Sequence, residues 1–367
     1  MAALAARAAP SCSATPAGVP LHSTRAQAFV RPDGRPVILN GLNVVPVWGA
    51  GRSWGRSTYR EIARRGFDSV RFVLYWDQLE PARGRFDAAR LATLDRAVAA
   101  AGAAGLHVLL DMVHLWGAGG MQSVPAWARD GDSVATVQAN AVPYVRMLAR
   151  RYAGDPVVAA YDPVNEPYRW PIDQDAVLRM YDRLIGAIRA VAPRKIVLVE
   201  PSYGDSSLAP GCADLGALTY RRDIVVSVHD YFAGGDADGF GRDCGQAGRH
   251  AYDGRTGYQP HAAGELRAHL QAYEDALAPA GLPLEVGEFG MGVRAQGQLS
   301  WIRQTTRLFD RLGLSRAWWE YHTTADASGL SATDADGRWR PFTRLLTAPR
   351  ARAAITPRRQ EGLPACA

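Results

Sequence analysis

Short apolar runs alternate with amphipathic segments from about residue 27 to residue 349. Nearly continuous apolar strands are typical of a parallel sheet that is covered on both faces. Eight such runs are candidate strands: Val37–Val45, Ser69–Tyr75, Leu106–Val113, Val157–Val164, Lys195–Glu200, Ile224–Tyr231, Pro283–Phe289 and Leu314–Tyr321.

The segments between these runs have helical periodicity. After Asp87, a predicted N-cap, Leu91, Leu94 and Val98 recur at helical spacing. A second stripe has the same period: Val137, Ala141, Tyr144, Val145, Leu148 and Tyr152. Eight strand–helix units in series predict an α/β fold, a single (β/α)8 TIM barrel.

The predicted barrel has short additions at both ends. Residues 29–37 read as a hairpin with Asp33-Gly34 at its tip. We expect residues 1–26 to be a flexible N-terminus or signal remnant, residues 27–349 to form the barrel domain, and residues 350–367 to be a tail too short for another domain.

A doubly wound open sheet is the rival fold for the same alternation. It usually has a glycine-rich turn after the first strand, where a phosphate meets a helix N-terminus. Gly49, Gly51 and Gly55 lie near that place but do not follow GxGxxG spacing. The barrel is therefore favoured.

Composition narrows the possible partners. The chain is 47% hydrophobic, enough for a large core, and no run of eighteen uncharged apolar residues indicates a transmembrane helix. The net charge of +6 comes from evenly spread arginines, with Lys195 the single lysine, whereas a nucleic-acid protein concentrates its charge on one face or tail. We therefore expect no nucleic-acid partner. We also expect the protein to be a monomer.

The four cysteines form an even set without CxxC spacing, which disfavours zinc. Two disulfides make geometric sense: Cys12–Cys366 across the ends of a closed barrel, and Cys212–Cys244 across the sixth strand. Together with the Ala-, Ser- and Pro-rich start, they predict a secreted or periplasmic protein. Four unpaired thiols and an unstructured start are the alternative.

Polar residues stand at the ends of successive predicted strands. In (β/α)8 enzymes the active site lies at the C-terminal ends of the strands. The residues at these positions, in strand order, are Arg71; Asp111 and His114; Asn165-Glu166-Pro167; Glu200; His229-Asp230-Tyr231; Glu288; and Trp318-Trp319-Glu320. A purely structural barrel has no need of such a series.

Two of these residues suit the cleavage of a glycosidic bond. That reaction needs a carboxylic acid to protonate the leaving oxygen and a carboxylate to meet an oxocarbenium-like centre. Glu166 and Glu288 end strands four and seven, on opposite sides of the ring, so their side chains can face each other across its mouth. The sequence cannot measure their separation, which distinguishes retention from inversion.

The two carboxyl groups need different environments. A nearby Arg71 cation and the Tyr231 hydroxyl are expected to keep Glu288 ionised. Partial burial and a negative neighbour are expected to raise the pKa of Glu166, so that it can donate a proton.

The alternation of side chains along a strand predicts which neighbours of Glu166 and Glu288 face the site. His229 and Tyr231 are two apart and point the same way, which places Asp230 on the opposite side and outside the catalytic set. Asn165 and Glu166 are adjacent, so both reach the site only if the strand twists or bulges at its end.

Aromatic side chains cluster in the predicted loops and strand ends, where sugar faces pack well on flat rings. We expect Trp127 to pack in the core and Trp319 to bind sugar. The full set is Trp48, Trp54, Trp116, Trp127, Tyr168, Trp170, Trp318 and Trp319.

Taken together, these residues resemble glycoside hydrolase family 5, the cellulase-like family of retaining (β/α)8 glycosidases, from about Phe29 to Pro349. The resemblance implies an acid/base role for Glu166, a nucleophile role for Glu288 and no cofactor. It also implies a substrate-binding set with Trp319 as the floor of the −1 subsite: Arg71, His114, Asn165, His229, Tyr231 and Trp319, to which the loop residues Trp48, Trp116 and Trp170 are added.

One further signature is similar to the endoglycoceramidase-like branch, whose members cut an oligosaccharide from ceramide. It comprises Trp76-Asp77-Gln78-Leu79-Glu80-Pro81 with Leu110-Asp111-Met112. The chain departs from that branch in having no room for a C-terminal β-sandwich, and in placing His114 in Val-His-Leu-Trp where the branch reads His-Gln-Asp. The expected substrate is therefore a carbohydrate or a glycolipid.

Two other functions compete with this reading. A barrel that binds glycan without cleaving it is expected to lack a catalytic carboxylate, and both are present. A metal-dependent hydrolase would use Asp111, His114, Glu200 and His229, but such barrels usually open with an HxH pair where this chain has Asn40-Gly41-Leu42-Asn43. No metal is expected.

Overall fold

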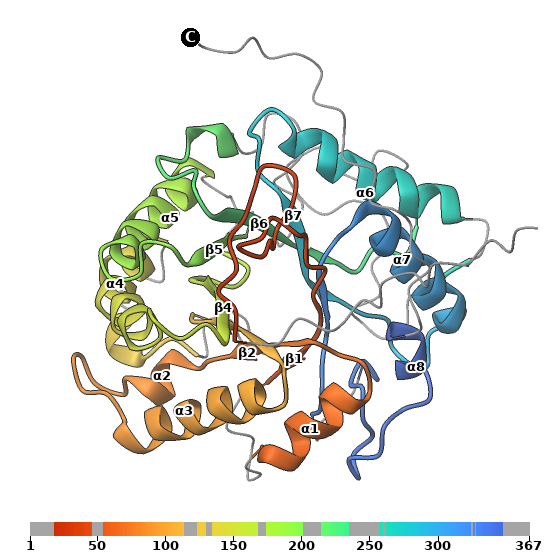
Figure 1. Ribbon diagram of the computed structural model, residues 1–367, viewed down its shortest axis with the longest axis horizontal. Helices are drawn as coiled ribbons and strands as arrows, with labels where there is room; N and C mark the ends of the chain where they lie inside the picture. The colour runs from red at the N-terminus through yellow and green to blue at the C-terminus, as the bar shows by residue number, and fades with distance from the viewer. Residues whose placement is uncertain are drawn as a thin grey trace, which may run out of the picture.

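Eight parallel strands close into a barrel in the computed structural model (Figure 1). The structure describes residues 18–45, 54–113, 123–129, 134–167, 174–200, 214–234, 257–259, 262–323, 326 and 328–347. The strands are β1 (Asn40–Val44), β2 (Ser69–Val73), β3 (His107–Asp111), β4 (Val158–Asp162), β5 (Ile196–Val199), β6 (Ile224–Asp230), β7 (Leu284–Phe289) and β8 (Arg316–Trp318). Each pairs with the next, and β8 pairs with β1, which confirms the predicted TIM barrel.

Helices surround the ring of strands (Figure 1). They are α1 (Arg56–Arg64), α2 (Trp76–Leu79), α3 (Ala88–Ala103), α4 (Val134–Arg151), α5 (Gln174–Arg189), α6 (Ala263–Leu277), α7 (Gln298–Leu312) and α8 (Thr343–Leu346). Within the ranges given above, none is both long and apolar enough to cross a membrane.

The helix boundaries follow from local chemistry. Asp87 caps α3, because its Oδ1 accepts the backbone N–H of Arg90 at 2.9 Å. Leu91, Leu94 and Val98 are buried on the face of α3 that packs on the barrel, as the periodicity predicts.

An N-terminal hairpin closes the end of the barrel where the strands begin. Val30 bridges both His22 and Pro36 in antiparallel fashion, and Gly34 turns the chain with a left-handed φ of 81°. Phe29 is fully buried against a cluster that includes Leu39 and Ile196, at the start of β1 and β5. In Figure 1 this red segment crosses the middle of the ring. The barrel floor is therefore an apolar plug.

The barrel interior changes from apolar to polar along the strands. Leu109, Ala160 and Leu198 contribute to the apolar cluster near the plug. Two residues further along each strand the inward positions hold carboxyl groups, Asp111, Asp162 and Glu200, all fully buried. The polar side chains thus gather at the C-terminal end of the barrel.

A bulge in β7 sets the direction of its last residues. Val228 pairs with Val286 and His229 pairs with Glu288, so Gly287 is an extra residue in β7. Glu285 lines a small cavity inside the barrel with Arg71. Residues three apart on a regular strand face opposite sides, so the bulge allows Glu288 to point inward as well.

Candidate active site

A fully buried arginine on β2 organises the polar end of the barrel. The Arg71 guanidinium donates to Asn43, Asn165, Glu200 and Glu288 at 2.7–3.1 Å, and its closest contact is Nη2 to Asp162 Oδ2 at 2.6 Å. Burial alone would lower the pKa of Arg71, but the surrounding carboxylates raise it well above its usual value. Arg71 is therefore a fixed cation shared by β1, β2, β4, β5 and β7.

Glu288, on β7, is held by two donors. Arg71 Nη1 donates to Oε1 at 3.1 Å, and the Tyr231 hydroxyl donates to Oε2 at 2.8 Å. Burial and the neighbouring Glu288 raise the pKa of Tyr231 well above its usual value, so the phenol keeps its proton and remains a donor. Both bonds favour the ionised form of Glu288.

Glu166 follows β4 in an unusual backbone conformation. Its φ of 42° is left-handed, although the residue is not glycine and precedes Pro167. Its backbone N–H donates to Glu200 Oε2 at 2.6 Å. This departure from the strand lets two adjacent side chains serve one site: Asn165 against Arg71, and Glu166, 23% exposed, at the mouth.

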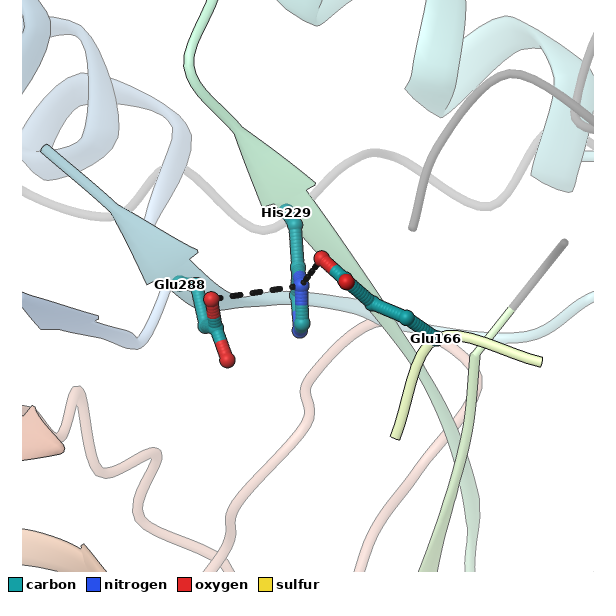
Figure 2. A group of neighbouring side chains, drawn as sticks. All are labelled: Glu166, His229 and Glu288. Carbon is teal, nitrogen blue, oxygen red and sulfur yellow. Dashed lines mark hydrogen bonds and ion pairs between the residues drawn. The ribbon is translucent and has the colours of Figure 1, made fainter. Parts of the chain in front are cut away.

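His229, on β6, lies between the two glutamates (Figure 2). Its Nδ1 is 2.5 Å from Glu166 Oε1 and 3.5 Å from Glu288 Oε2, and its Nε2 is 3.2 Å from Glu200 Oε1. Burial opposes a charge on the ring, but the three carboxylates raise the pKa of His229 well above its usual value. With carboxylate oxygens at both ring nitrogens, His229 favours its protonated form and links Glu166 to the buried Glu200.

Asp162 and Glu200 form a carboxyl pair beneath this imidazolium. Burial and the charge of Glu200 raise the pKa of Asp162 well above its usual value. Burial also opposes ionisation of Glu200, but the His229 and Arg71 cations lower its pKa to about 2. Of the two carboxyl groups, Asp162 is therefore the one that more readily holds a proton, beneath an ionised Glu200.

The residue on the other face of β6 has a different task. Asp230 points away from the site towards α6, where its Oδ1 lies 3.4 Å from His269 Nε2. Its Oδ1 also accepts the backbone N–H of Phe232 at 3.2 Å. These contacts agree with the alternation predicted for His229, Asp230 and Tyr231.

Glu166, His229 and Glu288 are also the one group of described side chains close enough to share a metal ion, with one ligand atom from each within 4.8 Å of the others. Metal ligation would need the neutral His229 ring with a free nitrogen, whereas both ring nitrogens lie against carboxylate oxygens, of Glu166 at 2.5 Å and of Glu200 at 3.2 Å. Asp111 and Glu200, which a metal-dependent hydrolase would use, instead surround the Arg71 cation at 3.6 and 2.9 Å. These residues do not fit a metal centre.

The two tryptophans at the end of β8 have different environments. Trp318 is fully buried, packs on Phe289 and Phe342, and donates its Nε1 proton to the carbonyl of Leu330 at 2.7 Å. Trp319 is partly exposed. Of the pair, only Trp319 has ring surface available to a ligand.

Trp127 packs in the way its sequence position predicts. Its ring meets Trp76 edge-on at 5.6 Å, and its Nε1 donates to the carbonyl of Glu80 at 3.1 Å. Arg83 covers the Trp127 ring at 4.7 Å. Trp127 is part of the packing around α2.

Several predicted positions lie outside the described residues. They are Trp48, His114, Trp116 and Trp170 of the substrate-binding set, and Cys12, Cys212, Cys244 and Cys366. The tail 350–367 and most of the segment 1–26 lie outside as well. The disulfides, the domain limits and the secreted location stay predictions.

The structure gives a place in the site to residues for which the sequence predicted no role. Asn43 and Asp162 bind Arg71 from β1 and β4, and each is a polar residue inside an apolar run, a signal that was available. Glu320 follows Trp319, is 6% exposed and accepts the Ser331 hydroxyl at 3.3 Å. Burial, with Asp326 and Glu288 nearby, raises the pKa of Glu320 to about 8, so it is a third, neutral carboxyl group beside the site.

The barrel and its opposed carboxyl groups define the class of protein. A (β/α)8 barrel that presents two carboxyl groups across its C-terminal end is built for glycoside hydrolysis. The sequence model of the Cellulase family (glycosyl hydrolase family 5) matches residues 30–324. The chain belongs to this family of retaining O-glycosyl hydrolases.

Relatives and solved structures agree with this assignment. The chain is 28% identical to endoglycoceramidase I of Rhodococcus hoagii (strain 103S), over 54% of this chain and 50% of the relative. It is also 28% identical to the probable glucan 1,3-beta-glucosidase A of Aspergillus clavatus, over 47% of this chain and 41% of the relative. The matches thus span half or less of these relatives. A crystal structure of an endogalactoceramidase has the same fold, with a TM-score of 0.68 at 23% identity, covering 90% of this chain and 84% of the other.

Proposed function

We propose that the protein hydrolyses β-linked glycosides by double displacement, with Glu288 as nucleophile and Glu166 as acid/base. The observation that carries the proposal is the short distance between the two side chains, which have carboxyl oxygens within 4.8 Å of each other. Retaining glycosidases place the two groups roughly 5–5.5 Å apart, whereas inverting enzymes need roughly 6.5–9.5 Å to admit a water between them.

The division of roles rests on the asymmetry of the pair. Glu288 is 5% exposed and receives hydrogen bonds from Arg71 and Tyr231, which keep its oxygens anionic and oriented. Glu166 is the more exposed group and contacts an imidazolium. The buried anion suits attack on carbon, and the exposed group suits proton exchange with a leaving group and with water.

The reaction then has two steps. A Glu288 oxygen attacks the anomeric carbon, the bond to the leaving oxygen breaks, and that oxygen takes the proton of Glu166. In the second step Glu166 removes a proton from water, the water oxygen attacks the anomeric carbon, and the bond to Glu288 breaks. Two inversions give net retention, and both glutamates return to their starting forms.

Two other residues are proposed to hold the sugar. The Asn165 side-chain nitrogen is buried and has no hydrogen-bond partner among the described residues, which suits it to the sugar 2-hydroxyl. Trp319 is proposed as the floor of the −1 subsite, because Trp318 is committed to the core.

Azide rescue tests the roles directly. Glu288→Gly should abolish turnover of an aryl β-glycoside, and azide should restore some turnover with the inverted α-glycosyl azide as product. Glu166→Gly, the matched control, should be rescued on activated aryl glycosides with the retained β-azide. Rescue products of the opposite configuration would exchange the roles, and full activity in Glu288→Gly would refute the proposal.

The substrate class is proposed as a β-linked glycan or glycoconjugate. Similarity to the Rhodococcus endoglycoceramidase favours a glycolipid as a second candidate substrate. A panel of β-glucan, β-mannan and a glycosphingolipid, each with and without EDTA, distinguishes them. Release of an intact oligosaccharide from the glycosphingolipid supports the second candidate, and loss of all activity in EDTA would refute a metal-free mechanism.

A further inference from the structure

Glu200 has no step in the proposed reaction, yet it contacts Arg71, His229 and the backbone of Glu166. It follows β5 and is fully buried, so it cannot touch a substrate. Its Oε1 accepts from Arg71 Nη2 at 2.9 Å and lies 3.2 Å from His229 Nε2. Its Oε2 accepts the backbone N–H of Glu166 at 2.6 Å.

We infer that Glu200 is a positioning residue that fixes both the backbone of Glu166 and the proton on His229. The inference rests on the proposed function, because it gives Glu200 its role through the proposed acid/base.

The first part of this role is mechanical. Glu166 is a non-glycine residue with left-handed φ immediately before a proline, a conformation that persists only when its surroundings enforce it. A buried carboxylate that accepts the N–H of Glu166 supplies such a restraint. Glu200 is itself held by Arg71, the same side chain that holds Glu288. The positions of both catalytic groups thus depend on Arg71, which binds Glu288 directly and Glu166 through Glu200.

The second part is electrostatic. His229 has Glu166 at Nδ1, Glu200 at Nε2 and Glu288 at 3.5 Å from Nδ1. Among the other charged groups, Arg71 contacts Glu200 and Glu288, and Glu285 lies further down the barrel on β7. His229 Nδ1 lies 2.5 Å from Glu166 Oε1, so the protonated ring can supply a proton to Glu166, the proposed general acid. The charge of Glu200 stabilises the protonated ring.

We therefore expect removal of the Glu200 charge to change the pH dependence of kcat/KM. The alkaline limb of the kcat/KM profile marks loss, in the free enzyme, of the proton that His229 supplies to Glu166. A carboxylate within ~4–6 Å favours the charged form of a neighbouring base by about 1–3 pH units. Glu200→Gln should move the alkaline limb to lower pH by at least about one unit, and lower kcat more than it changes KM.

Two variants separate this role from mere packing. Glu200→Asp keeps the charge but shortens the side chain, so we expect the alkaline limb to stay in place and kcat to fall at least ~10-fold from misplacement of Glu166. Glu80→Gln is the matched control, because Glu80 is a buried glutamate that accepts two N–H groups, from Trp76 and Gly84, outside the site. Its profile should keep the wild-type shape.

A titration of His229 provides a readout that does not depend on turnover. In protein labelled at histidine, the His229 signals are assigned by their loss in His229→Asn. They should report an imidazolium at pH 7 in the wild type and a lower titration midpoint in Glu200→Gln. If the wild type cleaves no glycoside, the proposed function fails, while this titration still tests Glu200.

Two results would overturn the inference. One is a folded Glu200→Gln whose alkaline limb and His229 titration match those of the wild type. The other is wild-type kcat in Glu200→Asp, which also decides the matter if Glu200→Gln does not fold.

Discussion

The extra residue in β7 leads to a prediction about a single methyl group. Gly287 lies at the bulge between Glu285 and Glu288, and its φ is not left-handed, so an alanine meets no backbone strain there. A Cβ at this position would lie 2.3 Å from Ser227 Oγ and 3.5 Å from His229 Nε2. Gly287→Ala therefore tests close packing at the bulge without a contribution from backbone strain.

The size of the effect follows from that distance. A Cβ cannot lie 2.3 Å from an oxygen, so Ser227 Oγ must turn to another rotamer or the bulge must move, and overpacking of a tight interior costs about 1–3 kcal/mol. The residue next to Gly287 is Glu288, and a misplacement of about 1 Å in a catalytic geometry costs on the order of 100-fold in rate. We expect Gly287→Ala to lower kcat/KM by ~10–100-fold and the thermal midpoint by a few degrees.

The assay is a double-mutant cycle with Ser227→Ala, which removes the oxygen in the way. Initial rates on an aryl β-glycoside and thermal unfolding are measured for both single variants and the double variant. Ser227→Ala should restore most of what Gly287→Ala loses, so the two changes should be strongly non-additive. Additive losses, or wild-type activity and stability in Gly287→Ala, would refute the packing argument.

Three further predictions follow from single contacts. Tyr231→Phe removes one charge-assisted hydrogen bond to Glu288, which is worth about 1.5–3 kcal/mol, so kcat/KM should fall by up to ~10–150-fold and the thermal midpoint should fall by a few degrees. An unchanged rate would contradict the role of the phenol. Burial raises the pKa of Glu285 from 4.5 to about 7, so the folded state binds an extra proton and loses stability as the pH rises from about 4.5 to 7. Glu285→Gln should remove this loss. In unfolding experiments, the stability of the variant relative to wild type should therefore rise by up to about 3 kcal/mol between pH 5 and pH 8. Phe29→Ala should cost about 3–5 kcal/mol at the barrel floor and leave kcat unchanged, and a loss of kcat would show that the floor and the site are coupled.

The fold was predictable because the apolar pattern and the barrel obey the same geometry. Each observed strand lies inside a predicted apolar run, as β8 does within Leu314–Tyr321. The strands are shorter than the runs because the last residues of several runs turn out of the ladder to form the site. Trp319 and Glu320 are such residues after β8.

The site was predictable as a set of residues but not as a network. Strand-end position was enough to select Glu166, His229 and Glu288, because the barrel brings all strand ends together, whereas Arg71 lies in the middle of β2. The proton arrangement depends on distances between side chains of different strands, which periodicity does not contain. The β7 bulge is an intermediate case: a glycine inside a strand indicates a bulge, but not the direction in which Glu288 then points.

Shared partners decide which substitutions act independently. Asp162, Glu200 and Glu288 all bind the one guanidinium of Arg71, and the charge of Glu200 raises the pKa of Asp162. Replacing one of them redistributes charge over the others, so effects within this group cannot add. Phe29 lies at the opposite end of the barrel, in an apolar cluster with Leu39 and Ile196 that contains none of these groups, so its effect should add to theirs. Stability and catalysis are separable between the two ends of this barrel, and inseparable around Arg71.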